Sequence, residues 1–439
     1  MKSLVRRSDF RLFLAAVLAA GMWCYADLIL VPHQVAEAVR REQPRGNLSD
    51  LYPRWLGARE LLLHGRDPYG SDVTREIQAG YYGRELDFRR PNDPKDQQGF
   101  AYPIYVVFLL APTMKAPFAT VQLAFRWILV LFIAASVPLW LWVVGWRISA
   151  AATLTAILLI LGSFPSVQAI KLQQLSVVVC LLLAASAACL VRRRLVLSGI
   201  LLALATIKPQ LAIPFTAWLL LWTLGKWRSR QRLLWSFLAA LTILVLGGEL
   251  VLPGWIARFR GAAAAYLQYA GGPSLLDIAL TPVWGRVISG FLILIVAFLC
   301  WRWRRASADS ELFRWNLAIV LTATLAVIPT SAPYNQLLLI PALLLLARWG
   351  PRLWHGPWFQ RLSIGLVVSV LALPWLAAAG LDFTLLFVRR EIIESAWVVP
   401  LWTSWAIPFP ILAAVALCAT QITKEESSTA VPVAAQVAR

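Results

Sequence analysis

The stretch that decides the fold class is residues 192–230, which read RRRLVLSGILLALATIKPQLAIPFTAWLLLWTLGKWRSR. An apolar run of 30 residues, 195–224, separates basic clusters at 192–194 and 226–230. Basic clusters beside apolar runs are typical of the cytoplasmic ends of membrane-spanning helices. With both clusters on one side, the run has to cross the membrane and return, although two full crossings need about 40 residues. The turn at 207–210 is therefore predicted to lie below the outer membrane surface, inside the protein or along a watery cavity.

The composition places the whole chain in the same class. Of its 439 residues, 59% are hydrophobic and 14% are charged, whereas soluble domains have about 45–50% and about 25%. Long apolar runs recur almost to the C-terminus, and the alternating segments of an outer-membrane barrel are absent. These features exclude a soluble enzyme, a disulfide scaffold and a disordered chain. They predict an all-α polytopic membrane protein.

The charge balance is strongly basic, with 41 Lys and Arg against 22 Asp and Glu and a net charge of +19. Such a balance can indicate a nucleic-acid partner. Here the basic residues occupy the short gaps between apolar runs, which is the positive-inside pattern. We therefore expect membrane lipids, and no nucleic acid, as partners. The five cysteines lie in apolar stretches without a CxxC pair, so neither a zinc site nor a disulfide framework is predicted.

The basic gaps act as cytoplasmic anchors for the topology. The first apolar run, 10–31, is too long for the core of a signal peptide and no cleavage site follows it, so we interpret it as a spanning helix with a cytoplasmic N-terminus. An even number of crossings between anchors predicts twelve spans, with both termini inside. The spans are placed near 10–31, 121–146, 149–163, 175–191, 195–207, 210–224, 233–252, 284–301, 315–329, 336–348, 362–380 and 397–420. Residues 1–423 then form one membrane domain, and 424–439 a flexible cytoplasmic tail.

The segment 32–99 is predicted to be a large extracytoplasmic loop. It carries 11 of the 22 acidic residues and is too long for a simple connector. Within it, residues 51–64 are predicted to form a helix, because Asp50 offers an N-cap, Pro53 suits the first turn and Gly65 follows as a stop.

Two segments near this loop are expected to lie on the membrane surface. In the helix 51–64, Trp55 and Leu62 on one side against Arg54 and Glu60 on the other predict an amphipathic interfacial helix. Residues 100–118 are apolar but contain three prolines, and a crossing there would reverse every later anchor. We therefore interpret 100–118 as a second interfacial helix.

The chain shows no nucleotide-binding or metalloprotease motif and no nucleophile elbow. Its three histidines are scattered, and the loop carboxylates Asp67, Asp72, Asp93 and Asp96 are interpreted as solvated. No metal site and no cofactor are therefore predicted, and a nucleotide-driven pump is disfavoured.

Two charged residues carry the chemistry that can be inferred, each with a plainer alternative. Asp50 is either an N-cap, worth about 1 kcal/mol, or a general base on the outer face, and the two roles are compatible. Lys208 either snorkels from a helix end or holds an anionic group, because a lysine deep in the bilayer costs about 2.5–3.5 kcal/mol without a cavity or a partner. Asp27 either pairs with a neighbouring cation or faces the site.

Several short motifs follow one another along the chain. Asp50 is followed by Tyr52, and the predicted helix closes with Gly65-Arg-Asp-Pro-Tyr69. Later come Phe100-Ala-Tyr102-Pro103, Gln173-Gln174-Leu-Ser176, Ile207-Lys208-Pro209 and Ser331-Ala-Pro333-Tyr334-Asn335-Gln336. In this order they resemble the polyprenol-phosphate-mannose-dependent mannosyltransferase-like family, glycosyltransferase family 87 of the GT-C superfamily, over about residues 10–350. The sequence departs from the family pattern at Ile104, Ser176 and the last motif, which lacks the histidines of the family.

The resemblance implies a GT-C-like bundle with its site on the extracytoplasmic face of the cell membrane. It implies transfer of a hexose, with mannose as the family sugar, from a polyprenyl-phosphate donor to a glycolipid, glycan or protein, with inversion. Asp50 would be the base, since a phosphate leaving group makes the second carboxylate of a glycosidase unnecessary. Lys208 and the outer cation Arg126 would hold the donor phosphate. The remaining motif positions would bind substrate: Tyr52, Tyr69, Tyr102, Gln174, Tyr334 and Asn335.

The main alternative is a multi-pass transporter or flippase of a lipid-linked or small polar substrate. A transporter should show related halves with paired broken helices. The chain shows one such break, at 207–210, and one large acidic loop, which favours the enzyme. A structural assembly subunit would leave Asp50 and Lys208 without a role.

Overall fold

The computed structural model describes residues 2–43, 49–87, 89–269, 271–329 and 331–421, and within these ranges it contains helices and no strand. The predicted all-α class is confirmed. The predicted tail, 424–439, lies outside the described residues.

Seven of the described helical segments are long and apolar enough to cross a membrane, or eight if a pair bent by 62° counts as one span. The bent pair is α7 (Ala150–Leu161) and α8 (Phe164–Lys171). The seven are α1 with η1 and α2 (Lys2–Tyr25, Ala26–Leu30, Val31–Arg40), α6 (Phe118–Val143), α12 (Trp227–Val251), α15 (Pro282–Arg302), η3 with α17 (Pro333–Leu339, Ile340–Trp354), α18 (Trp358–Thr384), and Val399–Gln421, which begins with α20 (Val399–Trp405).

Helix length does not support the count of twelve spans. The other predicted spans coincide with helices of 11 to 17 residues: α9 (Ser176–Val191), α10 (Leu195–Ala205), α11 (Pro209–Gly225) and α16 (Glu311–Val327). A full crossing needs about 20 residues. These shorter helices lie inside the bundle, where α9 and α16 bury most of their side chains. A helix surrounded by protein does not have to match the thickness of the lipid with its own apolar length.

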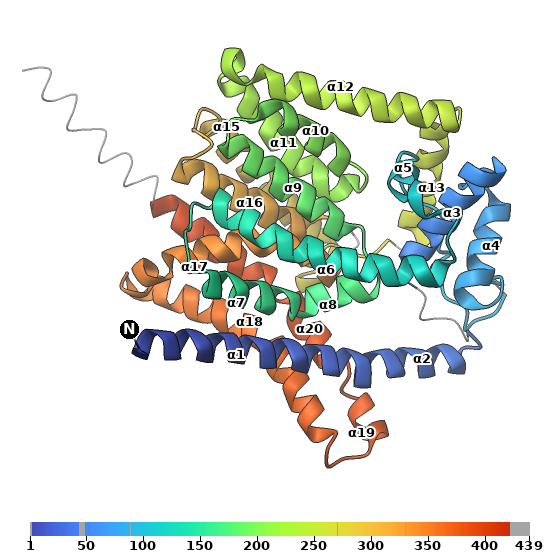
Figure 1. Cartoon of the computed structure of the whole chain (residues 1–439), viewed down its shortest axis with the longest axis horizontal. Coiled ribbons are helices and arrows are strands. Elements are labelled where there is room, and N and C mark those ends of the chain that lie inside the picture. Colours follow the sequence, from blue (N-terminus) through green and yellow to red (C-terminus); the bar gives the residue numbers. More distant parts are fainter. Residues whose placement is uncertain (1, 44–48, 88, 270, 330, 422–439) are drawn as a thin grey trace, which may run out of the picture.

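The basic gaps meet at one end of the bundle. The buried Arg230, between α11 and α12, donates to the carbonyl oxygens of Arg304 at 2.8 Å and Ala306 at 2.6 Å, between α15 and α16. Arg348 of α17 donates to the Val144 carbonyl oxygen after α6 at 2.7 Å and to Glu311 at 2.8 Å. In Figure 1 this is the end that holds the N-terminus, on the left. The gaps used as anchors in the sequence therefore share one side of the fold.

The first helix is longer than predicted. It continues without a break from the predicted span through Pro32 to Arg40, along one edge of the bundle in Figure 1. A proline inside an α-helix removes one hydrogen bond and crowds the preceding turn. Here the wider π-helical turn η1 directly precedes α2, in which Pro32 occupies one of the first two positions.

The opposite end holds the segment predicted as an outer loop, together with several short helices (Figure 1). The predicted helix 51–64 is confirmed as α3 (Leu51–His64), and Gly65 ends it with φ of 65°. This left-handed conformation is the one for which a helix C-terminus usually employs glycine. The other helices outside the spans are α4 (Ser71–Tyr82), α5 (Val106–Leu110), η2 (Ala111–Thr113), α13 (Trp255–Tyr269), α14 (Leu275–Ala279) and α19 (Arg390–Glu394).

Two details of this end differ from the sequence-based expectation. The charged side chains Arg54 and Glu60, expected on a solvated face of α3, are buried, because α3 packs against α4 and α5. Residues 100–118 are helical only in α5, η2 and the first residue of α6, since Pro103, Pro112 and Pro117 interrupt the run. Its apolar side chains Ile104, Val106 and Leu110 are fully buried, so they pack on the protein core.

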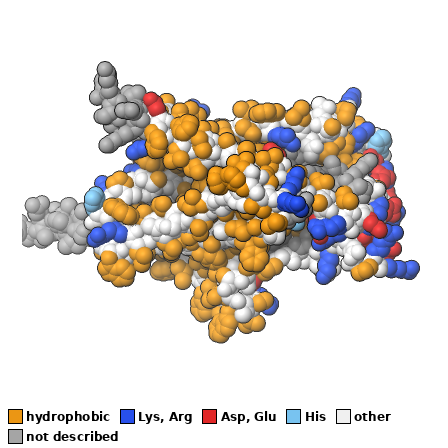
Figure 2. Space-filling model, turned by 90° about the horizontal axis from the view of Figure 1, so that it is seen from below, with side chains coloured by type: hydrophobic (Ala, Val, Ile, Leu, Met, Phe, Trp, Pro, Cys, Tyr) orange, Lys and Arg blue, Asp and Glu red, His pale blue; other side chains and the backbone are white. Residues whose placement is uncertain are grey.

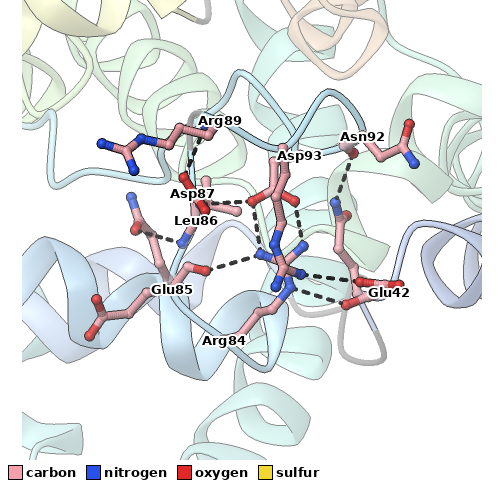
Figure 3. Close-up of polar contacts among 11 residues, drawn as sticks. Glu42, Arg84, Glu85, Leu86, Asp87, Arg89, Asn92 and Asp93 are labelled. Atoms are coloured by element: carbon pink, nitrogen blue, oxygen red, sulfur yellow. Dashed lines mark hydrogen bonds and ion pairs between the residues drawn. The ribbon is translucent and has the colours of Figure 1, made fainter.

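Charged side chains hold the outer end together. Figure 3 shows Arg84, after α4, donating to the Asp93 carboxylate at 2.8 Å and reaching the Glu42 carbonyl oxygen, beyond α2, at 3.4 Å. Arg66 similarly joins Glu60 of α3 to Glu76 of α4. In Figure 2 the acidic side chains gather at this end, while hydrophobic side chains cover the flank of the bundle.

Candidate active site

A cavity of about 350 Å³ opens where the outer end meets the bundle. Its wall combines the start of α3, the segment before α5, the start of α9, the break between α10 and α11, one face of α13 and the segment before η3. The lining residues are Asp50, Arg54, Ala101, Tyr102, Gln174, Lys208, Pro209, Gln210, Ile213, Phe259, Ala263, Tyr266, Leu267, Pro329, Tyr334 and Asn335.

Asp50 stands at the N-cap position of α3, but its side chain makes no capping hydrogen bond. Its carboxylate instead accepts a hydrogen bond from Nε2 of Gln174, and its backbone N–H donates to the Leu172 carbonyl oxygen at 3.1 Å. Burial raises the pKa of the Asp50 carboxyl above 3.8, and the positive charges of Arg54 and Lys208 oppose this rise. The carboxylate is therefore turned toward the cavity and is a stronger base than a solvated aspartate.

Lys208 occupies the break between α10 and α11, which lines the cavity as predicted. Pro209 begins α11, and the Tyr105 hydroxyl holds the preceding turn by donating to the Thr206 carbonyl oxygen at 3.1 Å. The Lys208 side chain is only 5% exposed. Its ammonium donates to Oε1 of Gln174 at 3.2 Å and lies 4.9 Å from the centre of the Tyr334 ring.

The Gln174 side chain connects the two charged residues, because its amide donates to Asp50 and accepts from Lys208. The neighbouring Gln173 makes this possible by turning the chain between α8 and α9 with φ of 45°. That conformation favours glycine, and Gln173 occupies the glycine position of the motif. Its amide stabilises the turn by donating to the Ile170 carbonyl oxygen at 2.7 Å.

The other predicted site residues divide into two groups. Tyr102, Tyr334 and Asn335 line the cavity, and the Oδ1 atom of the buried Asn335 has no hydrogen-bond partner within the described residues. Three residues lie outside the lining. Tyr69 donates from its hydroxyl to the Tyr102 carbonyl oxygen at 2.6 Å, and Tyr52 packs edge-on against Phe118 at 4.9 Å between ring centres. Arg126 lies on α6.

Two residues of the wall were not expected from the sequence. Arg54, interpreted as solvated, is buried, donates to the Asp50 carbonyl oxygen at 2.7 Å and lies 4.8 Å from the centre of the Tyr102 ring. Its position four residues after Asp50 could have indicated a shared helix face. Tyr266 reaches the cavity from α13, about 200 positions further along, and no local pattern marks it.

The remaining charged residues near the helix ends have other partners. Asp27 forms an ion pair with Lys171, one of the alternatives considered for it. Among the residues that the structure describes, no three His, Cys, Asp or Glu side chains come close enough to hold a metal ion.

The chain matches the model of glycosyltransferase family 87 over residues 100–329, which is more than half of its 439 residues. The chain belongs to glycosyltransferase family 87. No curated protein and no solved structure matches it. In this glycosyltransferase the matched region includes the cavity residues Tyr102, Gln174 and Lys208, whereas Asp50 precedes it.

Proposed function

We propose that this membrane glycosyltransferase takes a hexose, mannose in particular, from a polyprenyl-phosphate sugar and passes it to a hydroxyl of a glycolipid, glycan or protein. The reaction takes place in the cavity at the outer end, on the extracytoplasmic face of the cell membrane. The helices too short for a full crossing complete a twelve-span GT-C-like bundle. The family match favours this enzyme over the transporter or flippase considered from the sequence.

The observation that carries the proposal is the linkage of Asp50 to Lys208 through Gln174 in one cavity. The charged residues of its lining are Asp50, Arg54 and Lys208, so one negative and two positive charges leave an excess of one positive charge. A polyprenyl-phosphate sugar is a phosphodiester with one negative charge, which such a cavity suits. In surroundings with little water these charges attract the phosphate more strongly than they would at an exposed surface.

The wall of the cavity also suits both parts of such a donor. Lys208, Arg54 and the amide of Asn335 provide donors for the phosphate and the sugar hydroxyls. Ile213 and Leu267, on α11 and α13, are apolar lining residues that are more than half exposed. They provide an apolar border along which the polyprenyl chain can leave toward the lipid.

In the proposed step, the Asp50 carboxylate takes the proton of the acceptor hydroxyl. The acceptor oxygen forms the new bond to the anomeric carbon from the face opposite the phosphate. The bond between that carbon and the phosphate oxygen breaks, and its electrons leave with the polyprenyl phosphate. Lys208 stabilises the charge that develops there. Attack from the opposite face inverts the configuration at the sugar carbon, and one base is sufficient because the phosphate needs no proton to leave.

The test offers the purified chain in lipid vesicles two radiolabelled donors, a polyprenyl-phosphate mannose and GDP-mannose, with octyl α-mannoside as acceptor. We expect transfer from the lipid donor, an inverted anomeric centre by NMR, and no transfer from the nucleotide sugar. Transfer from GDP-mannose at a similar rate, or a product with retained configuration, would contradict the proposal.

A further inference from the structure

A second cavity, of about 670 Å³, lies at the other end of α10 from Lys208. Two elements supply its basic wall. Arg193 and Arg194 directly precede α10, while Arg228 and Arg232 lie one turn apart near the start of α12. The remaining lining residues are Leu195, Val196, Leu197, Ile200 and Ser229.

The four guanidinium groups repel one another without compensation from an acid. Within the described part of the chain, no ion pair or side-chain hydrogen bond joins any of the four to a carboxylate. Other arginines of the same gaps do have partners in the protein. Arg230 donates to main-chain carbonyl oxygens, and Arg192 lies 3.4 Å from the centre of the Trp142 ring. Four like charges around one cavity are unfavourable unless an anion occupies it.

Arg193 also adopts a costly backbone conformation. Its φ of 60° lies in the left-handed region, in the loop that joins α9 to α10. Glycine is the usual residue there, because a side chain is strained at such an angle. The sequence thus places an arginine at a position where glycine would satisfy the turn more easily.

The floor of the cavity is apolar and firmly held. Val196, Leu197 and Ile200 of α10 are 50%, 42% and 38% exposed. Beside them α10 packs closely on α12 at Gly199, where an added Cβ would lie 2.1 Å from the Ser236 hydroxyl oxygen. This contact fixes the two basic walls relative to each other. The cavity therefore combines a basic rim with an apolar strip along a helix, and both belong to the shape of a phospholipid.

We propose that this cavity binds an anionic phospholipid, with its phosphate groups on the four arginines and an acyl chain along Val196, Leu197 and Ile200. Four positive charges favour a headgroup with two phosphates, as in a diphosphatidylglycerol lipid. Basic pockets between membrane helices are suited to such headgroups. The site is separate from the glycosyltransferase cavity and does not depend on the donor proposed for it.

The test compares the full-length protein with the double variant Arg228→Gln/Arg232→Gln. A matched control, Arg147→Gln/Arg302→Gln, removes the same charge from exposed arginines outside the cavity. Each protein is titrated with diphosphatidylglycerol in detergent, and the bound lipid is counted by native mass spectrometry. Because each arginine near anionic lipid contributes favourably, we expect the cavity variant to bind at least about tenfold more weakly and the control to bind like the wild type.

Further arms separate a lipid site from other causes. Arg194→Gln alone should weaken binding in the same direction, so the result does not depend on one variant folding. Titration with phosphatidylcholine should show no saturable binding, and millimolar inorganic phosphate should not displace the lipid, because phosphate lacks the acyl chain. Equal loss in the control, equal binding of phosphatidylcholine, or displacement by inorganic phosphate would each overturn the proposal.

Discussion

Replacing Asp50 by asparagine separates its proposed chemical role from a structural one. The Asp50 side chain makes no capping bond in α3, so the roughly 1 kcal/mol of an N-cap is not at stake. The asparagine oxygen can still accept from Gln174, although a bond to a neutral acceptor is weaker by about 1 kcal/mol. Removing a buried negative charge relieves desolvation and offsets this loss. We expect Asp50→Asn to change the free energy of unfolding by less than about 1 kcal/mol.

The effect on the reaction should be far larger. An amide cannot take the proton of the acceptor hydroxyl, and general-base catalysis contributes about 10² to 10⁴ in rate. This corresponds to about 2.7–5.4 kcal/mol of activation free energy, at 1.36 kcal/mol for each tenfold change. The initial rate of mannose transfer from a polyprenyl-phosphate donor should therefore fall by a factor of about 100 or more, while donor binding persists.

The control is Asp72→Asn, the same substitution in the same outer region. The Asp72 side chain is 54% exposed and pairs with Arg66 away from the cavity lining, so the rate should stay near that of the wild type. Transfer by Asp50→Asn within about threefold of the wild type would refute the role of Asp50 as base. Loss of the folded protein in Asp50→Asn, seen in its thermal unfolding, would show that Asp50 is mainly structural.

Three further predictions follow from the same geometry. Lys208→Met should fold normally but bind the donor about 10- to 100-fold more weakly, since a hydrogen bond to a charged group is lost, and Lys208→Arg should retain part of the affinity; unchanged binding in Lys208→Met, measured by donor titration, would remove the phosphate role. Because burial raises the pKa of Asp50 and its carboxylate is the active form, kcat/KM should fall as the pH is lowered, with a midpoint above 3.8; Arg54→Gln should move that midpoint to higher pH, and no movement would count against the electrostatic coupling. Single cysteines at the exposed positions Ser71 and Ser229 should react with an impermeant reagent from opposite sides of the membrane, and labelling of both from one side would contradict the proposed topology.

The sequence by itself determined the features that depend on neighbouring residues. Apolar runs long enough to need burial indicated a helical membrane protein, and each predicted span coincides with a helix. The helix 51–64 followed from its own end signals, the proline in its first turn and the glycine after its last. Local chemistry of this kind depends little on the rest of the fold. Helix length was harder to predict, because a helix buried among other helices does not have to match the membrane.

The tertiary structure alone decided how the site is assembled. Asp50 meets Gln174 across 124 positions of sequence, and Gln174 meets Lys208 across 34. The sequence marked all three residues through motifs, but it did not show that one amide connects a carboxylate to an ammonium. It also placed Arg54 in solvent, whereas packing of α3 against α4 and α5 turns its guanidinium into the cavity wall. The charge and pKa of a buried group depend on the neighbours that packing brings to it, and those neighbours come from distant parts of the chain.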